Sequence, residues 1–163
     1  GAGQVILIGA PEARLELGGT LGADVALDLD ATTAAERVVA VRSVTGGRGA
    51  DVVIEASGSP QAVPEGLELL RDGGTYVVAG HYTDAGEISL NPHIDINLKH
   101  AVVKGQWGTD FHHLVGALRL LDRHSERLPF ASVIGGRYTL QQAGQALQDV
   151  AALRVTKAII TPV

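Results

Sequence analysis

The chain of 163 residues is long enough for one domain with a sizeable core, and its 45% hydrophobic and 19% charged residues exclude a disordered protein. Its net charge of −5, without any basic run, argues against nucleic acid or an anionic membrane as a partner. No cysteine is present, which excludes disulfide bonds and thiolate metal sites within the chain, and no apolar run approaches the ~18 residues that span a bilayer, so we expect a cytoplasmic protein without membrane contact.

Short apolar strands alternate with helices through the first 80 residues. Thr33 and Glu36 have capping-box spacing and predict the start of a helix that ends at Gly46. Ser59 and Pro60 predict an N-cap and first turn of the third helix. The expected strands cover residues 5–8, 25–27, 51–55 and 75–79. The first helix is expected at residues 12–21 and the third at residues 60–71.

The second half of the chain departs from this alternation. Residues 82–99 are polar and contain proline and glycine, so we expect an irregular excursion there. A strand is expected at 100–104, a helix at 110–123, and a short extended piece near Val133 and Ile134. Thr139 and Gln142 predict a second capped helix that runs to about Leu153, and a final strand covers residues 157–160.

Strands that alternate with helices of about 10–15 residues predict an α/β fold with a parallel, doubly wound sheet. In such sheets, ligands bind outside the carboxyl ends of the strands, where small residues allow the backbone to come close. Two predicted strands end in this way, at Ala56-Ser57-Gly58 and at Ala79-Gly80. The sequence therefore favours a nucleotide-type crevice at this edge of the sheet.

The histidines do not predict a metal site. His112 and His113 are adjacent, so on a helix they project about 100° apart and cannot share an ion as an i, i+4 pair does. The other histidines lack carboxylate partners at ligand spacing, and neither a P-loop nor a Gly-x-Ser-x-Gly motif is present.

The ordered set of these motifs resembles the C-terminal half of medium-chain, zinc-type alcohol dehydrogenases, the family of sorbitol and threonine dehydrogenases. Each motif is weak alone, but together they cover almost the whole chain in the family's order. The matching stretches are residues 4–8, 14–17, 21–24, 45–58, 69–80, 104–105 and 139–160.

The resemblance implies a Rossmann-type doubly wound parallel sheet that lacks its first strand and helix in this chain. In the family's strand order, the missing strand lies beside the strand at 51–55, so its absence leaves two unpaired internal edges. The resemblance also implies a partial NAD(P)-binding Rossmann domain at residues 1–109 and a segment at 110–163 that returns to the catalytic domain. The zinc ligands of the family belong to that catalytic domain, so zinc is expected in the whole enzyme and not on this chain.

The resemblance further implies binding sites for NAD or NADP. Gly9 stands where an acidic residue normally accepts hydrogen bonds from the adenosine ribose, and Arg14 resembles the basic residue beside that ribose, which tilts the expectation towards NADP. Ala79, Gly80 and His81 resemble the segment that meets the nicotinamide carboxamide, with His81 a loop histidine and not a catalytic base. The remaining expected contacts are Ala56, Ser57 and Gly58 at the ribose and Lys157 at the pyrophosphate. For Trp107 two roles stay open, shielding of the nicotinamide and buried packing.

By resemblance, the whole protein is an NAD(P)-dependent dehydrogenase of a small alcohol or its ketone, and this chain alone is inactive. A zinc-free reductase similar to quinone oxidoreductases is one alternative. A non-catalytic fragment that binds a nucleotide or dimerises is another. In the resembling family the last Rossmann strand pairs with its two-fold mate, so a homodimer through residues 100–104 is expected.

Overall fold

The computed structural model describes residues 1–162, which form two compact units of parallel strands and helices. One unit is continuous, Thr32–Asp110; the other combines Gly1–Ala31 with the chain from Phe111 onward. The expected α/β class is confirmed, because every strand pair in the described residues is parallel.

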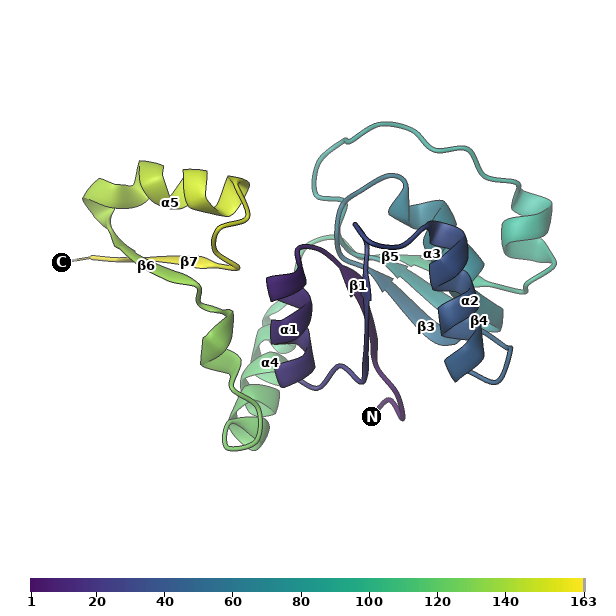
Figure 1. The fold of residues 1–163 in the computed structure, drawn as a ribbon, viewed down its shortest axis with the longest axis horizontal. Helices are drawn as coiled ribbons and strands as arrows, with labels where there is room; N and C mark the ends of the chain where they lie inside the picture. Colours follow the sequence, from purple (N-terminus) through teal and green to yellow (C-terminus); the bar gives the residue numbers. More distant parts are fainter. Residues whose placement is uncertain (163) are drawn as a thin grey trace. The chain divides into compact units, whose positions relative to one another are not determined.

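A three-stranded sheet forms the centre of the Thr32–Asp110 unit (Figure 1). Its order is β3 (Ala50–Glu55), β4 (Leu70–Val78), β5 (Val102–Gly105). Helix α3 (Ala62–Leu69) packs against β3 and β4, and α2 (Ala34–Val44) packs against α3. The β3–β4 register shifts between the pairs Ala50–Leu70 and Val52–Thr75, so residues 71–74 bulge out of the ladder.

Tyr76 is the centre of the core of this unit. Its side chain is fully buried against Leu67 and Leu70, and its hydroxyl donates a hydrogen bond to the Ala62 carbonyl at 3.2 Å. That bond satisfies the one polar atom that the buried ring carries. Burial raises the pKa of the Tyr76 phenol, and the negative charges of Glu55 and Glu65 raise it further.

Helices α2 and α3 are joined by a buried ion pair. The Arg37 guanidinium donates from Nε and Nη2 to the Glu65 carboxylate at 2.6 and 2.9 Å, and the Arg37 side chain is only 6% exposed. This two-point geometry fixes how the helices meet, because a buried guanidinium without its carboxylate is costly.

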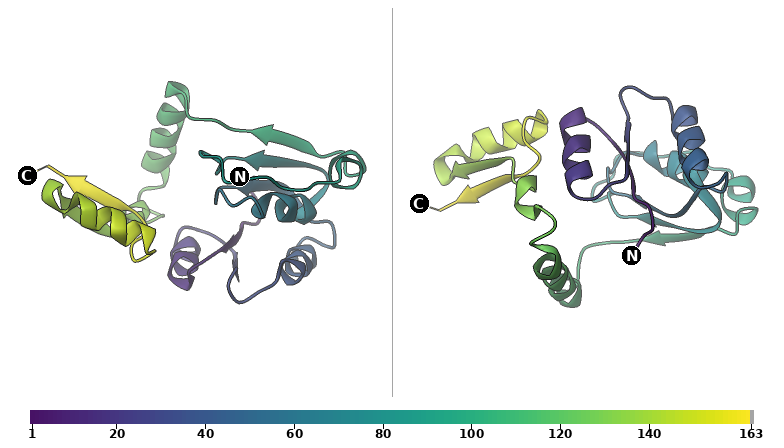
Figure 2. Two further views of the ribbon diagram at one scale, coloured as in Figure 1. Left: turned by 90° about the horizontal axis from the view of Figure 1, so that it is seen from above. Right: turned by 60° about the horizontal axis from the view of Figure 1, so that its bottom comes forward.

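The second unit contains two further parallel pairs. Strand β1 (Ile6–Gly9) pairs with β2 (Val25–Asp28), and α1 (Glu12–Thr20) connects them. After α4 (Phe111–His124), strands β6 (Gly136–Thr139) and β7 (Ala158–Thr161) pair with each other. Helix α5 (Ala143–Ala151) connects β6 to β7 and lies along them (Figures 1 and 2).

Both predicted capping boxes are confirmed. The Thr33 hydroxyl accepts from the Glu36 N–H while the Glu36 carboxylate accepts from the Thr33 N–H, and Thr139 and Gln142 form the corresponding pair. The second box opens a short 3₁₀ turn, Leu140–Gln142, that leads into α5.

Other local predictions are wrong. The N-cap of α3 is Gln61, and Ser59 and Pro60 form a turn before it whose carbonyls accept from the Ala62 and Val63 N–H groups. The expected extended piece near residue 133 is a 3₁₀ helix, Phe130–Val133, and strand β6 was not predicted. The excursion after β4 also contains a π-helical turn, His93–Asn97, that contacts α3.

The strands of the alternating region form two sheets, β1–β2 and β3–β4–β5. Among residues 1–162, β1 and β3 each have one strand neighbour, which agrees with the two unpaired edges expected from a missing strand. The proposed boundary near residue 110 between a Rossmann domain and a returning segment stays a prediction. Within the described residues, no helix has the length and apolar character needed to cross a bilayer.

Candidate cofactor site at the strand ends

The carboxyl ends of β3 and β4 meet around one buried carboxylate. Glu55, the last residue of β3, is 4% exposed. Its Oε1 atom accepts hydrogen bonds from the Ser57 N–H at 2.6 Å, the Ser57 hydroxyl at 2.7 Å and the Gly58 N–H at 2.7 Å. Its Oε2 atom accepts from the Gly80 N–H at 3.2 Å. A single side chain thus holds the loops that follow two neighbouring strands.

These hydrogen bonds determine the ionisation of Glu55. Burial favours the neutral acid, but the bonds from the Ser57 hydroxyl and from the Gly58, Ser57 and Gly80 N–H groups favour the carboxylate, and the net result is a lowered pKa for Glu55. The His81 Nε2 atom lies 3.5 Å from Oε2, within ion-pair range but beyond a good hydrogen bond.

Two glycines allow the loops to approach this closely. A Cβ atom on Gly80 would lie 2.4 Å from the Gly58 nitrogen, and one on Gly58 would lie 2.7 Å from the Gly80 carbonyl oxygen. Gly58 also has φ +73°, a conformation that residues with side chains rarely adopt. Because the obstructing atoms are backbone, a side chain at either position would force the two strand ends apart.

The backbone donors of the resulting rim are occupied within the protein. The N–H groups of Ser57, Gly58 and Gly80 all point at Glu55, whereas Ala56 and Ser57 are exposed. A sugar, whose hydroxyl groups can donate, fits such a rim better than a phosphate, which needs donors. These residues therefore suit the ribose of a nucleotide.

The segment after β5 ends at the same edge of the sheet. The Gln106 N–H donates to the Val78 carbonyl at 2.9 Å, and the next residue, Trp107, is 76% exposed. The Trp107 ring lies 5.7 Å from the Tyr82 ring, centroid to centroid, at an interplanar angle of 42°. Trp107 is therefore not buried within the described residues, and its shielding role stays a prediction.

The Thr32–Asp110 unit thus contains seven of the ten predicted site residues, all in segments that follow β3, β4 and β5: Ala56, Ser57, Gly58, Ala79, Gly80, His81 and Trp107. The other three belong to the second unit. Gly9 ends β1, Arg14 is half-buried in α1, and Lys157 is exposed just before β7.

Glu55 is the residue that the sequence analysis missed as part of the site. The available signal was an acidic residue at the end of an apolar strand, directly before Ala56-Ser57-Gly58. A charge in that position must be paired or hydrogen-bonded, because an isolated buried charge is too costly.

Metal chemistry has no candidate ligand set in the described part of the chain. Residues 1–162 contain no group of three or more His, Cys, Asp or Glu side chains placed to hold an ion. Zinc therefore does not fit these residues, and we assign no reaction step on this chain to a metal.

Comparison with known proteins identifies the family to which the chain belongs. The profile of zinc-binding dehydrogenases matches residues 1–123. The chain belongs to the zinc-binding dehydrogenase family. It is 33% identical over 160 residues to a 5-exo-hydroxycamphor dehydrogenase of Pseudomonas putida, covering 98% of this chain and 44% of that protein.

Other relatives extend this pattern. An L-threonine 3-dehydrogenase of Symbiobacterium thermophilum is 30% identical over 162 residues, covering 99% of this chain and 45% of that protein. The crystal structure of an alcohol dehydrogenase from Thermotoga maritima superposes with a TM-score of 0.93 at 36% identity, covering 100% of this chain and 44% of that one. The chain thus spans a little under half the length of these relatives.

Replacing Glu55 with Gln tests whether its carboxylate holds the loops after β3 and β4 together. An amide cannot accept on both sides, so one set of donors loses its partner, and we expect a loss of about 1–3 kcal/mol in the free energy of unfolding at neutral pH. Urea unfolding of the protein that contains this chain measures the loss, with the exposed Glu87→Gln as matched control.

The stabilisation by Glu55 should depend on pH in a defined direction. Because the folded pKa of Glu55 lies below its unfolded value, its charge stabilises the fold above the unfolded pKa of about 4.3 and this contribution is lost as pH falls through the folded value. The gap between wild type and Glu55→Gln should therefore narrow below about pH 4. A gap that stays constant down to the acid transition contradicts this role.

Proposed function

We propose that this chain is the cofactor-binding portion of an NAD(P)-dependent, zinc-type alcohol or polyol dehydrogenase. The observation that carries the proposal is the rim around Glu55, where the loops after two parallel strands present small residues and have their N–H groups occupied by Glu55, in a member of the zinc-binding dehydrogenase family. Ligands of open α/β sheets bind at this edge.

We infer the following division of roles among the site residues. Ala56, Ser57 and Gly58 contact the adenosine ribose, and Ala79, Gly80 and His81 lie along the nicotinamide end. Trp107 shields that end with its exposed ring, while Gly9, Arg14 and Lys157 serve the adenosine ribose and the pyrophosphate. When bound, the cofactor supplies the hydride acceptor; this chain's residues bind and orient it.

The substrate class follows from relatives. The hydroxycamphor and threonine 3-dehydrogenases are named for the oxidation of alcohols. We therefore propose a secondary alcohol, or the corresponding ketone, as the substrate of the protein that contains this chain. Because the chain spans under half of these relatives, the metal ligands and most of the substrate pocket are assigned to the rest of that protein.

Activity assays test this function. The whole protein should reduce NAD(P) in the presence of a secondary alcohol and lose that activity on treatment with a chelator, whereas residues 1–163 alone should give no turnover. Chelator-resistant activity would favour a zinc-free reductase. Chelator-sensitive turnover by residues 1–163 alone would contradict the assignment of the chemistry to residues outside this chain.

Cofactor choice depends on Gly9 in this proposal. A strand end without a carboxylate does not repel a 2′-phosphate, so we expect relaxed selectivity or a preference for NADP. Gly9→Asp should shift the ratio of kcat/KM values towards NAD, because the carboxylate accepts from the 2′-hydroxyl and repels the 2′-phosphate; Gly19→Asp, at an exposed site of α1, is the control. A strongly NAD-selective wild type that is unchanged by Gly9→Asp would contradict it.

We also propose a homodimer formed through β5. This strand has β4 as its one neighbour among the described residues, and its Val102 and Val103 are each 45% exposed. An apolar edge strand favours pairing with another strand, and a two-fold contact satisfies both copies at once.

A charge at the strand edge tests the dimer. Val102→Lys should convert the dimer to monomer or aggregate in light scattering, because the ammonium would have to be buried in the contact. Val39→Lys on α2, which is 68% exposed, is the matched control and should leave the mass unchanged. A wild-type protein that is monomeric at micromolar concentration rules out this interface.

A further inference from the structure

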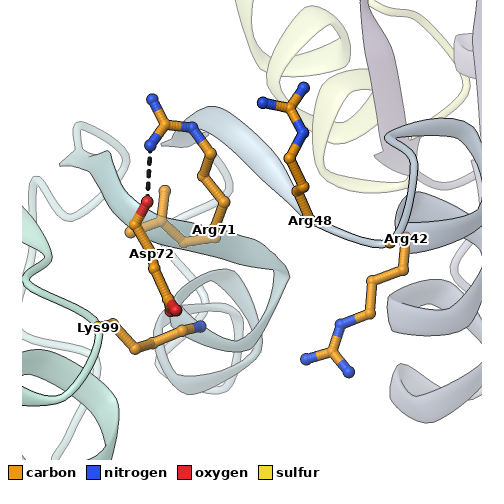
Figure 3. A pocket seen from close by; sticks show the side chains of 7 residues that line it. Arg42, Arg48, Arg71, Asp72 and Lys99 are labelled. Atoms are coloured by element: carbon orange, nitrogen blue, oxygen red, sulfur yellow. Dashed lines mark hydrogen bonds between the residues drawn. The ribbon is translucent and has the colours of Figure 1, made fainter.

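A cavity lies at the end of the three-stranded sheet that is opposite to the rim around Glu55. Its volume is about 410 Å³, and Gly47 and Arg48 line it just before β3 while Leu70, Arg71 and Asp72 line it at the start of β4 (Figure 3). Arg42 of α2 and Lys99 before β5 complete the lining. Since β3 runs from this end to Glu55, the two sites are separated by about 17 Å along the strand.

Positive charge dominates this cavity. Its lining contains four basic side chains, Arg42, Arg48, Arg71 and Lys99, against the single carboxylate of Asp72. The chain as a whole has a net charge of −5, so this concentration of positive charge is local.

Two of these cations already have structural roles. The Arg71 Nε atom donates to the Asp51 carboxylate at 2.5 Å, and its Nη1 atom donates to the Asp72 carbonyl at 2.6 Å. The Lys99 ammonium donates to the Leu67 carbonyl at the end of α3. These contacts hold both charges at the cavity wall.

The other two cations are less constrained, although the Asp51 carboxylate interacts electrostatically with Arg48. Arg42 and Arg48 form no ion pair within residues 1–162, and the one side-chain contact of Arg48 is a long 3.4 Å bond from Nε to the Thr45 carbonyl. Both residues line the cavity, and Figure 3 shows their side chains on separate segments, with the guanidinium groups pointing in opposite directions. Burial lowers the pKa of Lys99; the Asp72 carboxylate opposes this shift, the positive charge of Arg42 adds to it, and Glu68 and Asp95 oppose it.

The neighbouring cavity provides an internal comparison. It has a volume of about 810 Å³ and shares Arg42 and Lys99, but Arg37 is its only further cation and Glu65, Glu68 and Asp95 also line it. Three cations therefore face three carboxylates there, and the excess of positive charge is confined to the smaller cavity.

We propose that the smaller cavity is a binding site for a small anion of the phosphate class with two or more negative charges. Planar guanidinium groups match the oxygen geometry of phosphate, and a hollow of this size suits a compact ligand. A nucleic acid or acidic protein would need a wider basic surface than four side chains on a chain with net negative charge.

This site goes beyond the proposed dehydrogenase function, because it lies at the amino ends of the strands and shares no residue with the rim around Glu55. An anion held there would connect α2, the loop before β3 and the bulge at the start of β4. Its effect on the fold would be direct stabilisation by binding, independent of the nicotinamide cofactor.

Calorimetric titration with inorganic pyrophosphate tests the proposal in the protein that contains this chain, at ionic strength held constant with KCl. We expect saturable binding at a single site that persists when NAD(P) is present at saturation. Arg42→Ala and Arg48→Ala should each weaken it about tenfold, because each removes a charge-assisted contact. Arg119→Ala, an exposed residue of α4 with the same change in net charge, should bind as wild type.

Several outcomes overturn the site. These are the absence of saturable binding in the millimolar range, equal affinity in wild type and both cavity variants, and loss of pyrophosphate binding on addition of NAD(P). Citrate that binds as tightly as pyrophosphate overturns the phosphate class. The variants are expected to fold because neither arginine has an ion-pair partner, and their NAD(P) affinity, measured in parallel, reports on the dehydrogenase proposal separately.

Discussion

The ionised carboxylate of Glu55 is the constraint on which the functional edge depends. At the ends of β3 and β4, the Glu55 carboxylate accepts hydrogen bonds from the N–H groups of the loops that follow both strands. Two consequences follow together. The loops close on each other until only Gly58 and Gly80 can occupy the contact, and the N–H groups of Ser57, Gly58 and Gly80 are no longer available to a ligand.

The same sheet separates two kinds of chemistry by strand direction. At its carboxyl end lie small residues with a buried acid, and at its amino end lie long basic side chains around a hollow. The register shift between β3 and β4 contributes to this difference, because the bulged residues Arg71 and Asp72 leave the ladder and line the cavity. The two ends share the sheet but no side chain.

Local signals in the sequence predicted most of the fold. The capping boxes at Thr33 and Thr139 and the apolar runs before Gly9 and Ala56 act over a few residues, so they can be recognised without knowing the tertiary structure. Ser59 is not the N-cap because α3 starts only at Ala62, after a turn in which the Ser59 N–H donates to the Ser57 hydroxyl.

The candidate site was predictable in its location but not in its construction. The small residues after two strands marked the edge, whereas the bond from Gly80 to Glu55 joins positions 25 apart in sequence and depends on the strands being neighbours. The cavity at the other end was also out of reach, because Arg42, Arg48, Arg71 and Lys99 have no regular spacing and come together only through the parallel order of β3, β4 and β5.

The division of the chain into a continuous and a discontinuous unit has a consequence for biosynthesis. Residues Thr32–Asp110 contain β3, β4 and β5 and the helices that pack on them, so this unit can begin to fold once Asp110 has left the ribosome. Within the segment Gly1–Ala31, strand β1 can pair with β2, but the remainder of its unit follows Phe111, so this unit is completed only after the entire intervening unit has been synthesised. At about 5–20 residues per second this interval lasts several seconds, during which the segment Gly1–Ala31 lacks the second part of its unit.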